Sequence, residues 1–80
     1  MTWKDYIDSD QKVLAGKPKI KGTRLSVEFL IGRMADGWTE EEILENYPHL
    51  TKEALQAVYL YLLEIIQDGI IYAPMTKEAA

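Results

Sequence analysis

The residues of this 80-residue chain best suited to chemistry are basic and lie close together. The segment 11–27 holds five of the nine lysines and arginines, and no acid lies between Asp10 and Glu28. A local excess of positive charge can bind phosphates even when the net charge is −4, as it is here. The alternative is a solvated, lysine-rich segment that protects a strand edge from aggregation. The predicted nucleic-acid contacts in this segment are Lys17, Lys19, Lys21 and Arg24.

Groups for catalysis or metal binding are scarce. The chain has no cysteine, and His49 is its single histidine, so thiolate ligands, multi-histidine sites and cysteine nucleophiles are excluded. The acids 40–42 fit the first turn of a helix better than they fit a cation site. The run 22–24 lacks the glycine spacing of a phosphate loop. We therefore expect no enzymatic activity, no metal and no cofactor.

The basic segment is predicted to be extended. Pro18 fixes its own φ and removes a backbone donor, which restricts this part to an edge strand or an arm. Two short strands are expected, near residues 4–7 and 19–21, followed by a turn at Gly22. Residues 1–26 are thus expected to form an N-terminal extended or β arm.

Three helices are predicted after the arm. Apolar residues at i, i+3, i+4 and i+7 predict a helix over 27–35, with Ser26 as its N-cap. Thr39 and Glu42 form a capping box for a short second helix. Thr51 begins a third helix, which runs to about residue 67. The fold class is therefore mainly α: a helix-turn-helix-like domain over 27–68, preceded by a short β element and followed by a tail over 69–80.

The third helix is apolar on more of its surface than one small domain can cover. Leu55, Val58, Leu62 and Ile65 form its core stripe, yet other faces are apolar as well. We therefore expect a homodimer. The segment 70–72 either joins that interface or folds back to complete the core. The predicted interface residues are Tyr59, Leu60, Tyr61, Leu63, Ile66, Ile70, Ile71 and Tyr72.

A helix-turn-helix protein reads DNA with polar residues early in its recognition helix. In this chain Lys52 and Gln56 occupy such positions. Glu53 and the acidic second helix oppose this docking, because phosphates repel carboxylates. The basic arm is the better phosphate contact, with Arg24 and Arg33 expected beside it.

The motif Gly-x-Pro-x-Ile-x-Gly-Thr-Arg-Leu-x-Val at 16–27, with the segments 37–39 and 41–51, resembles the domain-of-unknown-function family 433. The resemblance covers about residues 4–68. It implies a short β element before a helix-turn-helix-like domain, and an antitoxin role opposite a PIN-like ribonuclease toxin. It carries over no catalytic residue. The chain departs from the family pattern at Lys19, where a smaller apolar residue is commoner, and beyond Gly69.

The function predicted from these features is that of a non-enzymatic antitoxin or DNA-binding regulator with operator DNA as a partner. The alternative is a protein-binding or scaffolding module without nucleic-acid binding, whose basic arm lies across the acidic site of a toxin. No apolar run approaches the roughly 20 residues of a membrane span, and no signal core is present. We therefore expect no membrane partner and a cytoplasmic location.

Overall fold

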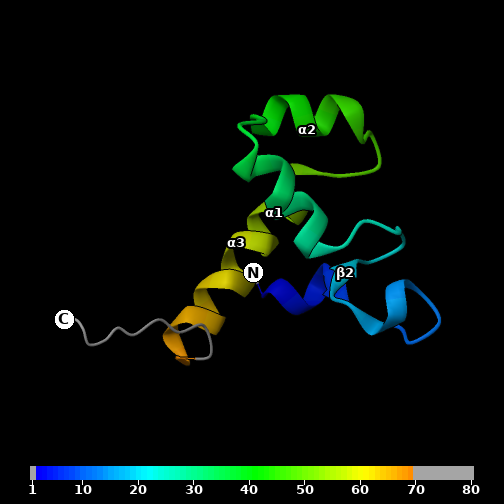
Figure 1. Cartoon of the computed structure of the whole chain (residues 1–80), viewed down its shortest axis with the longest axis vertical. Helices are drawn as coiled ribbons and strands as arrows, with labels where there is room; N and C mark the ends of the chain where they lie inside the picture. The colour runs from blue at the N-terminus through cyan, green and yellow to red at the C-terminus, as the bar shows by residue number, and fades with distance from the viewer. Residues whose placement is uncertain (1, 70–80) are drawn as a thin grey trace.

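The computed structural model of the chain describes residues 2–69. These residues form three α-helices and a two-stranded antiparallel sheet, which confirms the mainly helical fold (Figure 1). The predictions for Ile70, Ile71, Tyr72 and the rest of the tail lie outside the described residues. In chain order the elements are η1 (Trp3–Asp5), β1 (Ile7–Asp8), η2 (Leu14–Gly16), β2 (Lys19–Ile20), α1 (Val27–Ala35), α2 (Glu40–Asn46) and α3 (Lys52–Gln67), where η denotes a 3₁₀ helix.

The helix starts are fixed by side-chain caps. Ser26, Thr39 and Thr51 each accept a hydrogen bond from the backbone N–H three residues further on. The Glu42 carboxylate in turn accepts from the Thr39 N–H at 2.8 Å, which completes the predicted capping box. Gly37, with φ of +95°, follows α1 in the left-handed conformation that glycine favours. The predicted helix boundaries are thus confirmed.

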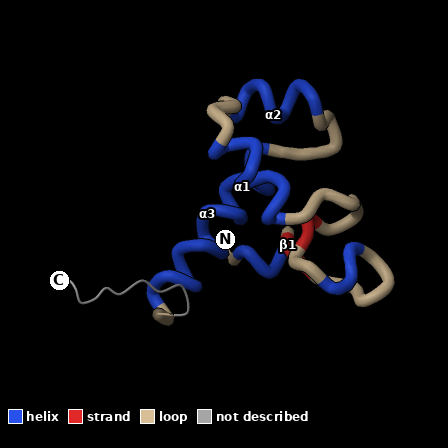
Figure 2. The backbone as a smooth tube through the Cα atoms, viewed as in Figure 1, coloured by secondary structure: helices blue, strands red, loops and turns tan. Residues whose placement is uncertain are grey.

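The predicted strand at 4–7 is largely wrong. Thr2 accepts a hydrogen bond from the Lys4 N–H, and residues 3–5 form a 3₁₀ turn. Strand pairing begins only at Ile7, which lies opposite Ile20, and continues with Asp8 opposite Lys19. Figure 2 shows how small the strand content of the N-terminal segment is. The turn has a packing reason: it brings the Trp3 ring edge-on to Tyr61 of α3, with 4.9 Å between ring centroids.

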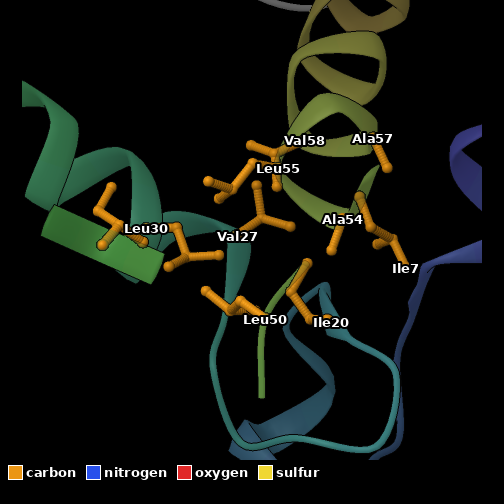
Figure 3. Packing of buried hydrophobic residues seen from close by; sticks show 10 residues of the cluster. Ile7, Ile20, Val27, Leu30, Leu50, Ala54, Leu55, Ala57 and Val58 are labelled. Carbon is orange, nitrogen blue, oxygen red and sulfur yellow. The ribbon is translucent and has the colours of Figure 1, made fainter. Parts of the chain in front are cut away.

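The N-terminal segment packs against the helices. Ile7 and Ile20 are buried in the same cluster as residues of α1 and α3. The Val27 N–H, at the start of α1, donates to the Pro18 carbonyl at 2.9 Å. Side chains from these distant segments point toward one another in Figure 3. The labelled residues of this core are Ile7, Ile20, Val27, Leu30, Leu50, Ala54, Leu55, Ala57 and Val58.

The fully buried residues of α3 lie in its first half, and Tyr61 and Leu62 of the second half pack partly buried against the core. These buried residues are Ala54, Leu55, Ala57 and Val58. Residues 47–51 connect α3 to the preceding helix α2, which lies at the top of Figure 1. Among the described residues, no helix has both the length and the apolar character to cross a membrane.

Candidate nucleic-acid and partner-binding surfaces

The turn between β2 and α1 presents two of the predicted phosphate contacts. Lys21 and Arg24 are both exposed there. The Thr23 hydroxyl donates to the Ile20 carbonyl at 2.9 Å and accepts from the Leu25 N–H at 3.0 Å. These two bonds hold the turn in one shape. We call residues 21–24 the basic turn.

The other two lysines of the basic segment are paired. The Lys19 side chain is only 8% exposed, and its ammonium lies 2.9 Å from the Asp8 carboxylate. Strand pairing places these two residues opposite each other, so Lys19 is poorly placed for the predicted phosphate contact. Lys17 lies 2.9 Å from Glu28, but both side chains are more than half exposed. An exposed pair of this kind is weak, and Lys17 can exchange Glu28 for a phosphate.

Arg33 lies between two aromatic rings. Its guanidinium carbon is 5.2 Å from the Phe29 ring centroid and 5.3 Å from that of Trp38. Asp36 lies 3.5 Å away, and the Arg33 Nε is buried without a hydrogen-bond partner. Arg33 is in the last turn of α1, whereas Arg24 precedes the first, so the structure does not bring these two arginines together. Arg33 mainly stabilises the end of α1.

Lys52 and Gln56 are exposed and line one groove with Glu40, Glu53 and Tyr59, between α2 and α3. The Tyr59 hydroxyl donates to the Glu40 carboxylate at 3.2 Å. Partial burial of the ring, and then this hydrogen bond and the charge of Glu40, raise the pKa of Tyr59 above its ordinary value of 10.0. Two carboxylates beside one lysine make the groove acidic, which disfavours phosphates there.

The second half of α3 presents large apolar side chains to solvent. Tyr59 is 44% exposed, Leu63 49% and Ile66 57%. Their spacing of four and three residues places them on one side of the helix. Leu60 is half-buried, and Tyr61, another predicted interface residue, contacts Trp3 within the chain. We call Tyr59, Leu63 and Ile66 the α3 ridge.

Sequence reasoning missed an apolar hollow beside this ridge. It has a volume of about 240 Å³ and lies between α1, α3 and the segment that leads into β2. Its residues are far apart in the chain, so no local pattern could have indicated it. We call it the α1–α3 hollow; it is lined by Lys17, Pro18, Val27, Glu28, Ile31, Tyr61 and Leu62.

Metal ligands do not come together in the part of the chain that the structure describes. No group of three or more histidine, cysteine, aspartate or glutamate side chains there could hold a metal ion. The candidate surfaces considered for function are the basic turn, the acidic groove, and the α3 ridge with its hollow.

Residues 7–62 match the sequence profile of a family described as protein of unknown function (DUF433). The crystal structure of a DUF433 member protein from Anabaena variabilis ATCC 29413 is similar to this chain, with a TM-score of 0.74 and 31% sequence identity. The similarity covers 81% of this chain and 64% of that one, so this chain spans less than two thirds of the length of its relative. No curated protein matches the sequence.

Proposed function

The chain belongs to the DUF433 family of proteins of unknown function, and we propose that it is a non-enzymatic regulator of the antitoxin type. In this proposal the basic turn binds DNA and the α3 ridge binds a protein chain. The observation that carries the proposal is the separation of two surfaces of different chemistry. Exposed cations lie between β2 and α1, and exposed apolar residues lie in the second half of α3.

The basic turn suits the DNA backbone. The Thr23 hydrogen bonds restrain the backbone of the turn, so little backbone entropy is lost when Lys21 and Arg24 bind phosphates. A guanidinium can hold a phosphate through two parallel hydrogen bonds. Lys17 provides a third cation once it leaves Glu28. We therefore propose that the basic turn supplies most of the affinity for DNA.

Sequence readout by α3 is the less favoured part of the proposal. Lys52 and Gln56 are exposed in the first turns of the helix and could reach base edges. Glu40 and Glu53 lie in the same groove and repel phosphates. We therefore expect a modest preference among DNA sequences.

The antitoxin assignment rests on the family resemblance. We propose a PIN-like ribonuclease toxin as its partner and the cytoplasm as its site of action. The exposed apolar residues of α3 support a protein partner, because large apolar patches mark interaction sites.

The test is a fluorescence-anisotropy titration with the DNA upstream of the gene and with a scrambled sequence, across a salt series. The double variant Lys21→Ala/Arg24→Ala should bind more weakly, with a logarithmic salt slope smaller by about 2. Lys4→Ala removes one positive charge outside the basic turn. It should leave the affinity for DNA and the salt slope unchanged. Absence of binding at low salt, or a double variant that binds like the wild type, would contradict the DNA part of the proposal.

A second candidate is a protein-binding module without nucleic-acid binding. The acidic groove formed by Glu40 and Glu53 favours it, because that groove lies on the face expected to approach DNA. This candidate would be favoured over the first if the chain inhibits the ribonuclease encoded beside its gene but binds neither the upstream DNA nor the scrambled DNA.

A further inference from the structure

The described part of the chain ends at a glycine whose conformation turns the backbone at the end of α3. Gly69 has φ of +74°, and its N–H donates to the Ile66 carbonyl at 3.0 Å. A left-handed glycine with this hydrogen bond is typical of the Schellman motif, in which the next residue commonly makes an apolar contact with the last turn of the helix. The residues that follow are Ile-Ile-Tyr. We infer that the segment 70–72 returns along α3 and that Tyr72 occupies the α1–α3 hollow.

The register of α3 directs this segment toward the hollow. Leu62 lines the hollow, and Gly69 follows it by seven residues, or almost two full turns, so both lie on one side of the helix. Ile65 lies between them on that side and is half-buried. Leu62 and Gly69 are about 10 Å apart along the helix axis. Three residues of extended chain also span about 10 Å, which brings Tyr72 level with Leu62.

The hollow has the size and the chemistry that a tyrosine requires. Its volume of about 240 Å³ exceeds the roughly 150 Å³ that admits a benzene ring. Most of the lining is apolar, but it includes Lys17 and Glu28, which form an exposed ion pair. A buried tyrosine needs apolar contacts for its ring and a polar partner for its hydroxyl. Within the segment 70–72, Tyr72 is the residue that matches both parts of this lining.

The alternation of side chains supplies a matched control. In an extended segment, successive side chains point to opposite faces, so Ile70 and Tyr72 face α3 and Ile71 faces away from it. This orientation agrees with the apolar contact of a Schellman motif, which would join Ile70 to Ile65. The inference goes beyond the proposed function. It leaves the α3 ridge open to a protein partner, because Leu63 is about 100° around the helix from Leu62.

The first test is nuclear magnetic resonance of the isotope-labelled full chain. Nuclear Overhauser contacts should join the ring of Tyr72 to the methyl groups of Val27 and Ile31, which line the hollow. A sample that mixes labelled and unlabelled copies separates contacts within one chain from contacts between chains. Absence of these contacts overturns the inference. Contacts that arise only between chains also overturn it, because a second copy would then be the occupant.

The second test is urea unfolding of tail variants at several protein concentrations. Tyr72→Ala should lower the unfolding midpoint by the same amount at every concentration, because docking within one chain does not depend on mass action. Ile71→Ala should leave the midpoint unchanged. A midpoint of Tyr72→Ala equal to that of the wild type overturns the inference, and so does an equal loss in the two variants.

Discussion

The two halves of α3 have similar apolar content and different surroundings. In the first half, Leu55 and Val58 are fully buried by α1, by the loop before α3 and by the N-terminal strands. In the second half, the N-terminal segment reaches the helix through Trp3, which contacts Tyr61 and donates to Glu64, while Tyr59, Leu63 and Ile66 are exposed. The comparison teaches that apolar periodicity marks a face that needs covering and does not say which chain covers it. The first half stabilises the monomer, and we assign the second half to association.

The largest expected effect compares one leucine from each half. Leu55→Ala removes a fully buried side chain and should lower the free energy of unfolding by about 2–5 kcal/mol. Leu63→Ala, at a half-exposed position, should cost the monomer about 0.5 kcal/mol or less. Urea unfolding at low protein concentration measures both. Equal losses would mean that the second half of α3 belongs to the monomer core.

The same contrast between covered and uncovered groups applies to the two lysine pairs. Asp8→Ala leaves the buried ammonium of Lys19 without its carboxylate and should cost about 1–3 kcal/mol. Glu28→Ala breaks an exposed pair with the same 2.9 Å separation and should cost about 0–1 kcal/mol. Thermal unfolding of both variants checks this order. A larger loss for Glu28→Ala would show that Lys17, and not Lys19, is the structural lysine.

The smallest expected effect is at Tyr59, where the two halves meet. Because its pKa is raised in the folded state, the contribution of this tyrosine to stability is present below pH 10 and is lost as the pH rises through the folded-state pKa. Glu40→Gln should lower that pKa only part of the way, since burial of the ring is the larger cause. The pKa of Tyr59 is measured by ultraviolet titration of the wild type, after the titration curve of Tyr59→Phe is subtracted.

Dimerisation would bury Tyr59 further, so the pKa of the wild type should rise with protein concentration. A pKa independent of concentration, in a protein that dimerises, would place Tyr59 outside the interface.

The features that could be predicted from sequence are those fixed by neighbouring residues. The caps at Ser26, Thr39 and Thr51 depend on hydrogen bonds that span three residues, and all three form. The strand predicted at 4–7 failed because its alternation of residue types did not reveal the packing of Trp3 on Tyr61.

The candidate surfaces were harder to predict because they depend on contacts between distant segments. Lys19 looks like any exposed lysine until strand pairing sets Asp8 beside it. Arg33 is held by Trp38, beyond the end of its own helix. The α1–α3 hollow joins residues of three segments. By contrast, the exposure of Tyr59, Leu63 and Ile66 agrees with the sequence pattern, since a helix apolar on several faces exceeds what one small core can cover. Their place in an interface stays a prediction.

The most direct test of the assignment of α3 is the urea unfolding midpoint of the wild type over a roughly 100-fold range of protein concentration, because association stabilises the folded state by mass action. The homodimer predicted from the sequence requires the midpoint to rise with concentration in the wild type and in Leu14→Glu, whose exposed leucine lies outside α3, and to be constant in Ile66→Glu. A wild-type midpoint that does not depend on concentration, and that coincides with that of Ile66→Glu, would contradict the claim that the second half of α3 is an association surface.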